Sequence, residues 1–183
     1  MSYCTSAADH PLHGPYHDHE YGFPLTSDPL LFERLILEIN QAGLSWLTIL
    51  KKRDGFRQAY SNFDIAAVAA YDDDDRNRLL ADSRIIRNRL KVDAAITNAR
   101  RIMDIQEEFG SFFAWLDHHH PLKKPEWVKL FKKTFTFTGG EITGEFLMST
   151  GYLPGAHARD CPVFETIAAQ KPGWMDAEGF YNS

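Results

Sequence analysis

Two cysteines and two histidines stand at positions from which they could share a metal ion. His157 and Cys161 are four residues apart, so both side chains would lie on one face of a helical turn. Cys4 and His17 stand near the other end of the chain. Two thiolates and two imidazoles suit tetrahedral Zn²⁺, and four protein ligands would leave no position for a reacting water. The pattern allows a closed, structural zinc site, but it equally allows free structural thiols or reactive thiols.

A carboxylate could do chemistry beside an aromatic side chain. Glu38 lies at the edge of the apolar stripe of residues 28–41, whereas Glu33 lies on the opposite side of the same expected helix. A carboxylate at the rim of a buried face is partly desolvated, which changes its pKa and its hydrogen bonding. The tight turn expected at Gly43 leads directly to Trp46, so Glu38 could lie next to an aromatic surface. The alternative is an ordinary surface glutamate whose methylene stem covers apolar neighbours.

Two further segments carry polar side chains at close spacing. Residues 16–21 contain two histidines, two carboxylates and two tyrosines, which invites a metal-site interpretation; a polar turn is the alternative, because adjacent residues cannot all point at one ion. Residues 85–91 join two expected helices and could present backbone N–H groups to a phosphate, with Arg87, Arg89 and Lys91 supplying positive charge. This second pattern is weak by itself, because helix–turn–helix pairs occur in any all-α protein.

Helical periodicity dominates the elements that must position these residues. Apolar residues recur at helical spacing over most of the chain. Good capping side chains stand at the starts of several segments, among them Asp28, Asp64, Asp72 and Ser111. Helices are expected over residues 28–41, 45–53, 64–70, 72–81, 88–108, 112–119, 125–133, 141–150 and 162–169. Residues 134–138 alternate as a strand would, but no second strand is evident to pair with them. The sequence therefore predicts an all-α protein of roughly eight to ten short helices.

Composition indicates a cytoplasmic globular protein. The chain has 183 residues, which suits one domain, and 44% of them are hydrophobic, which excludes a disordered or collagen-like chain. No run approaches the ~18–20 apolar residues of a membrane span, and residues 1–10 lack the pattern of a secretory signal. In a reducing cytoplasm Cys4 and Cys161 would not form a disulfide. The net charge of −5 argues against general polyanion binding, although basic residues gather in local clusters.

Several segments match the pattern of one known family in order. They are Tyr16-His17-Asp18-x-Glu20-x-Gly22-x-Pro24, Leu37-Glu38-x-x-Gln41-Ala42-Gly43-Leu44-Ser45-Trp46, Ile85-Ile86-Arg87-Asn88-Arg89-x-Lys91, Asn98-Ala99-Arg100, Gly151 and His157-x₃-Cys161. These segments resemble the 3-methyladenine DNA glycosylase I family, within the helix-hairpin-helix glycosylase superfamily. The resemblance runs from Cys4 to Cys161, so it covers most of the chain. The block from Gln41 to Trp46 and the cysteine–histidine pairs at both ends are its most specific parts.

The resemblance implies an all-α helix-hairpin-helix DNA glycosylase fold in a single domain over residues 1–183. The helix-hairpin-helix region would lie at about residues 72–104. One structural Zn²⁺ would join the terminal segments 1–24 and 151–183. The residues that match the family's zinc ligands are Cys4, His17, His157 and Cys161.

The resemblance also implies a DNA repair enzyme that hydrolyses the N-glycosidic bond of 3-methyladenine in alkylated double-stranded DNA, without lyase activity. The base would be flipped into a pocket, where Glu38 matches the catalytic carboxylate that reads the purine edge. Tyr16 and Trp46 match the aromatic walls that stack on the base. His13 stands where the family usually has an aromatic pocket residue; if protonated, it would repel a cationic base. DNA contacts would come from the glycine turn and the hairpin, through Gly43, Leu44, Arg87, Arg89 and Lys91. We expect a monomer.

The chain departs from the family's usual pattern at several positions, which leaves a second hypothesis open. Tyr21 stands where Trp is frequent, Ile39 replaces a more polar residue, and Glu145 occupies a helix in which small or hydroxyl residues are usual. A divergent, non-catalytic helical zinc protein could keep this fold, with or without DNA binding. Retention of the pocket carboxylate and of both aromatic walls favours the enzyme. Release of free methylated base from alkylated DNA would separate the two hypotheses.

Overall fold

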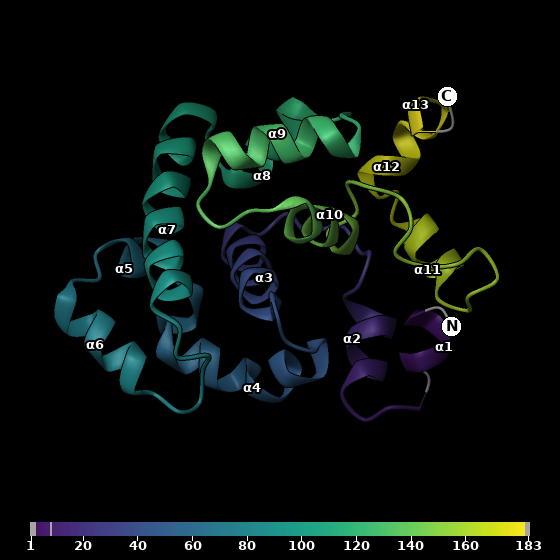
Figure 1. Cartoon of the computed structure of the whole chain (residues 1–183). Coiled ribbons are helices and arrows are strands. Elements are labelled where there is room, and N and C mark those ends of the chain that lie inside the picture. Colours follow the sequence, from purple (N-terminus) through teal and green to yellow (C-terminus); the bar gives the residue numbers. More distant parts are fainter. Residues whose placement is uncertain (1–2, 8, 182–183) are drawn as a thin grey trace.

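Helices make up all the regular secondary structure that the computed structural model describes, which is residues 3–7 and 9–181 (Figure 1). The elements are α1 (Tyr3–Ala7), α2 (His13–His19), α3 (Asp28–Gln41), α4 (Trp46–Ala59), the 3₁₀ helix η1 (Ser61–Phe63), α5 (Ile65–Ala69), α6 (Asp73–Ala81), α7 (Arg89–Phe109), α8 (Phe112–His119), α9 (Lys124–Thr134), α10 (Gly140–Ser149), α11 (Phe164–Ala169), α12 (Gly173–Asp176) and α13 (Glu178–Tyr181). The all-α prediction is confirmed. The predicted number of helices was too low, because short helices near both ends carry too few residues to show a periodic pattern.

Helix α3 runs through the middle of the fold (Figure 1) and packs against α4, α7, α8 and α10. Every residue from Leu31 to Asn40 is buried, including Glu33, Arg34 and Glu38. The sequence predicted one apolar face with Glu33 on the other side. The structure differs because neighbouring helices enclose α3 on all sides, so its charged residues are buried together with its apolar ones.

Several helices begin where their capping residues predicted. Asp64 and Ser111 accept hydrogen bonds from the backbone at the starts of α5 and α8, and Asp72 forms a capping box at the start of α6. Asp28 was expected to cap α3, but it lies inside that helix, and Ser27 precedes it. The Asp28 carboxylate instead accepts hydrogen bonds from the N–H groups of the first two residues of α8, at 2.8 and 3.0 Å. It therefore fixes the start of α8 against α3.

Of residues 134–138, Thr134 ends α9 and the others form a turn between α9 and α10, so the strand-like alternation was misleading. The Asn98 side chain of α7 takes the place of a partner strand. Its Oδ1 accepts from the Thr136 N–H at 2.8 Å, and its Nδ2 donates to the Thr136 carbonyl at 3.0 Å. Because one buried amide satisfies both backbone groups, no second strand is needed.

The two ends of the chain lie side by side. Helices α1 and α2 and the segment before α11 are neighbours in Figure 1. At the contact, Gly22 has a φ of +82°, and a Cβ there would lie 2.8 Å from Ala156 Cβ. A glycine is therefore needed for both conformation and space. The outermost residues of the predicted terminal segments, 1–2 and 182–183, lie outside the described residues.

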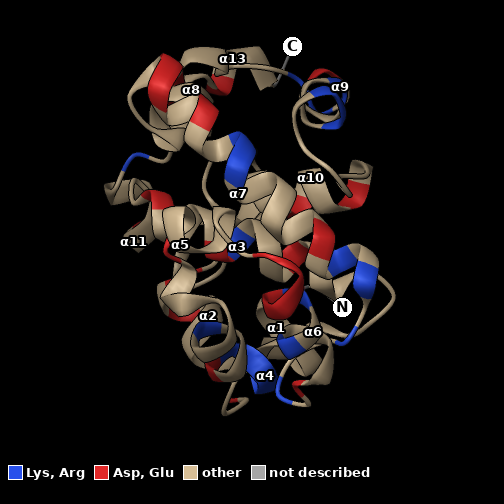
Figure 2. Ribbon diagram, turned by 90° about the vertical axis from the view of Figure 1, so that its left-hand side faces the viewer, with Lys and Arg blue, Asp and Glu red and all other residues tan. Residues whose placement is uncertain are grey.

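Charge is mixed over the surface. Figure 2 shows acidic and basic residues interspersed along the ribbon in this view, with basic residues on α4 and α9. Over the described ranges, no helix is both long and apolar enough to cross a membrane.

Candidate active site and metal centre

A cavity of about 260 Å³, called here the base cavity, collects three of the four pocket residues that the sequence predicted. Five helices and the turn after α2 contribute to it. Its lining consists of Tyr3, Tyr16, Tyr21, Glu38, Gln41, Trp46 and Glu145. The structure therefore brings the predicted Tyr16, Glu38 and Trp46 together. Tyr3, Tyr21 and Glu145 were not assigned to the pocket from the sequence, because no local pattern links them to residues so far along the chain.

Aromatic rings form a continuous wall in the base cavity. The ring centroids of Tyr16 and Trp46 are 5.1 Å apart, those of Tyr16 and Tyr21 are 5.8 Å apart, and those of Tyr3 and Tyr21 are 5.2 Å apart. At these distances the rings contact each other. The resemblance implied that both rings stack on the base, but Tyr16 and Trp46 are adjacent walls, so a base cannot lie between them. The buried Tyr16 hydroxyl and Trp46 Nε1 have no hydrogen-bond partner in the described part of the chain.

Glu38 is the most deeply buried charged group of the base cavity, with 5% of its surface exposed. Burial raises the pKa of its carboxyl group to about 8, with a smaller upward contribution from Glu145, while Arg34 acts in the opposite direction. No hydrogen bond reaches the Glu38 carboxylate from any described residue. The alternative of a solvated surface glutamate is therefore excluded. An unpaired buried acceptor of this kind is typical of functional sites.

Arg34 supports the cavity from behind. Its guanidinium carbon lies 4.9 Å from the centre of the Tyr16 ring, and its Nη1 donates to the Ser149 carbonyl at 3.1 Å. This residue was missed in the sequence. Its position four residues before Glu38 places both on one face of α3, and that spacing was the available signal.

A second cavity of about 550 Å³, called the outer cavity, continues from the base cavity. The two share Glu38, Gln41 and Glu145, and the outer one extends to Gly43 and Leu44. Gly43 has a φ of +80°, a conformation that favours glycine, and the turn leaves the Leu44 side chain 42% exposed. An apolar side chain is thus presented to solvent at the mouth that leads to Glu38.

Residues 82–88 connect α6 to α7, at the place where the sequence predicted a hairpin. Asn88 accepts a hydrogen bond from the Lys91 N–H and begins α7, while the side chains of Arg87 and Arg89 are exposed. Lys91 requires a correction. It is buried, and its Nζ donates to the carbonyls of Asn40 and Ala42 at 2.8 and 2.7 Å. Its charge neutralises the C-terminal end of α3 and does not face a phosphate.

His13 does not line the base cavity but contacts Tyr3, which does. Its Nδ1 is 2.9 Å from the Tyr3 hydroxyl, and the two rings meet edge to face with centroids 5.5 Å apart. Burial, with a contribution from His10, lowers the pKa of His13. The structure thus places Tyr3 between His13 and the cavity.

The four predicted metal ligands meet in space. One ligand atom from each of Cys4, His17, His157 and Cys161 lies within 4.8 Å of the others, so the group could hold a metal ion. The nitrogen–sulfur distances are 3.8 Å for His157 Nδ1 to Cys4, 3.4 Å for His157 Nδ1 to Cys161 and 3.6 Å for His17 Nε2 to Cys161. Tetrahedral zinc with ordinary bond lengths separates a nitrogen and a sulfur ligand by about 3.5 Å.

The remaining ring nitrogens of both histidines are also occupied. His17 Nδ1 lies 2.7 Å from Asp18 Oδ1, and His157 Nε2 lies 2.7 Å from the Tyr21 carbonyl oxygen. Contacts of this kind fix the ring orientation and tautomer of metal-binding histidines. The donor set therefore fits a closed metal site, with His17 binding through Nε2 and His157 through Nδ1.

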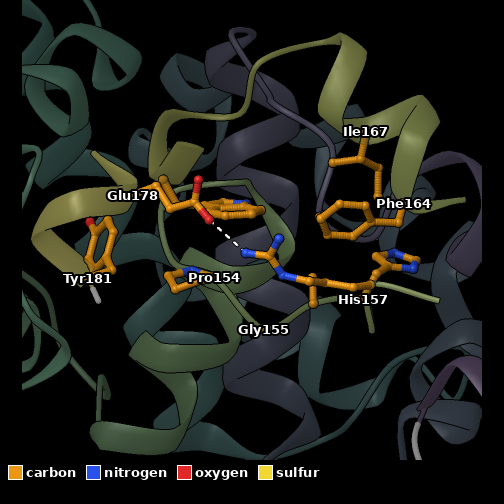
Figure 3. Close-up of a pocket in the computed structure, with 11 residues that line it drawn as sticks. Pro154, Gly155, His157, Phe164, Ile167, Glu178 and Tyr181 are labelled. Atoms are coloured by element: carbon orange, nitrogen blue, oxygen red, sulfur yellow. Dashed lines mark hydrogen bonds and ion pairs between the residues drawn. The ribbon is translucent and has the colours of Figure 1, made fainter. Parts of the chain in front are cut away.

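A smaller cavity of about 130 Å³ lies between the metal-ligand segment and the C-terminal helices. Figure 3 shows Phe164 and Ile167 on one side of it and Glu178 on the other. Arg159 also lines this cavity and donates a hydrogen bond to Glu178 at 2.7 Å. Of the predicted site residues it contains only His157. This cavity is therefore separate from the base cavity.

The comparisons with known proteins agree with this geometry. Residues 6–127 match the methyladenine glycosylase family. The chain is 42% identical to DNA-3-methyladenine glycosylase 1 of Escherichia coli, covering 88% of this chain and 96% of that protein. It is 33% identical to DNA-3-methyladenine glycosylase of Haemophilus influenzae, covering 87% and 96%. The solved structure of 3-methyladenine DNA glycosylase I from Staphylococcus aureus matches with a TM-score of 0.79 and 31% identity, covering 89% of this chain and 96% of that one.

The chain is therefore an all-helical glycosylase with a cavity lined by aromatic side chains. It belongs to the 3-methyladenine DNA glycosylase I family, and it is a hydrolase of that glycosylase type.

Proposed function

We propose that the protein hydrolyses the N-glycosidic bond of 3-methyladenine in alkylated double-stranded DNA and acts on a base that has been flipped out of the duplex. The observation that carries the proposal is the base cavity, in which aromatic rings lie around a buried glutamate side chain that has no ion-pair or hydrogen-bond partner among the described residues. Electron-rich rings and a nearby anion attract a cationic methylated purine. A duplex does not expose this base, so it must leave the stack to enter such a cavity.

Glu38 would read the purine edge. Its carboxylate accepts a hydrogen bond from the adenine amino group, while Tyr16 and Trp46 contact the ring as adjacent walls. Guanine-type lesions would present a carbonyl where adenine presents the amino group, and a buried acceptor left without its donor costs about 1–3 kcal/mol. The cavity should therefore prefer adenine-type lesions. Unmodified adenine lacks the positive charge and should be spared.

Once the base is bound, hydrolysis of the N-glycosidic bond needs little further catalysis from the protein. Methylation at N3 makes adenine cationic and hence a good leaving group, the sugar becomes oxocarbenium-like, and water captures it. A Schiff-base lyase needs a nucleophilic lysine at the site. The residues that line the base and outer cavities include no lysine, which supports a monofunctional enzyme.

DNA would dock across the glycine turn and the hairpin. Leu44, presented by Gly43, fills the space that the flipped base leaves. Amides at the start of α7 and the exposed Arg87 and Arg89 contact the backbone. Reversing the charge of both arginines should weaken DNA binding and flatten its salt dependence. Unchanged affinity and salt dependence would show that the hairpin is only a connector.

Zinc would hold the two ends of the chain together and take no part in the reaction. With Cys4, His17, His157 and Cys161 as ligands, its coordination would be complete. Metal analysis should find one Zn²⁺ per chain in the wild-type protein, and Cys161→Ala should lose it and melt at a lower temperature. A metal-free wild-type protein whose melting does not change with a chelator would contradict this role.

The direct test of the proposed function is base release. Purified protein is incubated with methylated and unmethylated duplex DNA, and the released bases are separated and identified. Free 3-methyladenine from the methylated duplex, without strand cleavage, is the expected result. Absence of any released base would instead support a non-catalytic zinc protein.

A further inference from the structure

Glu145 brings a second carboxylate to the base cavity. It lies on α10 and is half-buried, and together with Glu38 and Gln41 it belongs to both the base cavity and the outer cavity. The shared residues mark the place where one cavity opens into the other. A base that travels from Leu44 toward Tyr16 would pass Glu145.

This carboxylate has no ion-pair partner among the described residues. The Tyr21 hydroxyl donates a hydrogen bond to Glu145 Oε2 over 3.4 Å. The nearby lysine, Lys124, instead approaches Glu141 Oε1 at 3.8 Å. A partly desolvated anion without a cation is unfavourable by itself, so its charge is available to a ligand.

The groups around Glu145 act on its pKa in both directions. Burial raises the pKa of Glu145 and Glu141 adds to this, while the Tyr21 hydrogen bond and Lys124 lower it. Glu145 in turn raises the pKa of Glu38. Glu145 is less buried than Glu38, so desolvation opposes its negative charge less strongly than it opposes that of Glu38.

We propose that Glu145 is a specificity-determining residue whose carboxylate selects purines with a positive charge over neutral purines. The inference rests on the proposed function, since it assumes that a purine occupies the base cavity. Aromatic contact with the rings is available to neutral and cationic purines alike, whereas attraction to Glu145 is available only to the cation. One charge acting over several ångströms near a protein surface changes affinity by about tenfold.

The test compares two probes that lack the sugar. The 3,9-dimethyladeninium ion carries a fixed positive charge, and 9-methyladenine is neutral. Their dissociation constants are measured by calorimetry at about pH 9, above the ordinary titration range of glutamate. Wild-type protein should prefer the cation, and Glu145→Gln should bind it about tenfold more weakly. Affinity for the neutral probe should change by less than about twofold, which also shows that the cavity is intact.

Two variants serve as controls. Glu145→Asp keeps the charge and should keep the preference for the cation. Glu141→Gln removes the same charge one helical turn earlier, where the side chain is 92% exposed, so solvent screening should keep its effect within about twofold. Glu145→Gln should also move the pH dependence of cation binding to lower pH, because Glu38 would then ionise more readily. A merely structural role would not cause this shift.

Two results would overturn the inference while leaving the proposed function intact. In one, Glu145→Gln retains the wild-type preference for the cation. In the other, it weakens the binding of both probes equally, which would show that Glu145 only supports the cavity wall. Failure of the wild-type protein to bind either probe or to release methylated base from DNA would overturn the proposed function itself.

Discussion

Helix α3 keeps two glutamates in the protein interior in two different ways. Glu33 and Glu38 are both 5% exposed. Glu33 accepts hydrogen bonds from Arg53 Nε at 2.6 Å and from Arg57 Nε at 3.1 Å. Glu38 receives none from the described residues, and the nearby guanidinium of Arg34 donates to a backbone carbonyl instead.

The difference separates a structural acid from a functional one. A buried carboxylate with arginine partners is compensated within the fold, and removal of a partner is costly. A buried carboxylate without a partner destabilises the empty protein and gains its partner when a ligand binds. Burial alone therefore does not identify the site; burial without compensation does.

The largest expected effect concerns Glu33, the buried glutamate of α3 that has arginine partners. Arg53 also donates to both carboxylate oxygens of Glu20, at 2.6 Å each. Arg53→Met would leave Glu20 and Glu33 short of positive charge and should lower the free energy of unfolding by about 3–5 kcal/mol. Urea denaturation measures this loss. Lys51→Met, an exposed change on the same helix, is the control, and equal stability of the two variants would contradict the comparison.

The second expected effect is on catalysis and concerns Glu38, the buried glutamate of α3 without a partner. Glu38→Gln removes the charged acceptor for the base and should lower kcat/KM for release of 3-methyladenine by about tenfold to hundredfold. Glu33→Gln changes the same functional group on the same helix outside the cavity. Its folded fraction should retain nearly wild-type kcat/KM. Equal losses in both variants would show that Glu38 acts only through stability.

The third expected effect is on the pH dependence of stability. In the folded protein the pKa of Glu38 is raised to about 8, whereas an unfolded chain releases this proton near ~4.3. Between these values the folded protein holds a proton that the unfolded chain has lost, so the free energy of unfolding falls as pH rises. Glu38→Gln should therefore become more stable than wild type as the pH rises from ~5 to ~8, and the difference should shrink again below pH ~5. Urea denaturation across this range measures the difference, and a gap that does not vary with pH would contradict the raised pKa.

Local sequence features predicted the parts of the fold that local interactions determine. Capping at Asp72 and Ser111 depends on residues within one helical turn, and both caps form. The block around Glu38 and Trp46 combines a helix end, a glycine turn and a helix start, so its geometry was also accessible.

The remaining parts of the site depend on contacts between distant segments. Periodicity assumes that a helix has one solvent-facing side, and this assumption failed for Glu33 because four helices enclose α3. Lys91 was assigned to DNA because a lysine beside a hairpin is usually exposed, whereas α3 ends within reach of its ammonium group. Tyr3 and Glu145 come from opposite ends of the chain, and no sequence spacing links them to Glu38.

The measurement that tests the central claim most directly is the titration of the Glu38 carboxyl group by ¹³C NMR, without and with 3-methyladenine. Glu33 serves as the internal reference, because its signal should not respond to the base. Without the base, Glu38 should titrate near pH 8, and saturation with the base should lower its pKa, because the ligand supplies the hydrogen-bond donor that the protein lacks. If the pKa of Glu38 is ordinary in the empty protein and the base does not change it, this would contradict the claim that the Glu38 carboxyl group lacks a protein partner and gains one from the ligand.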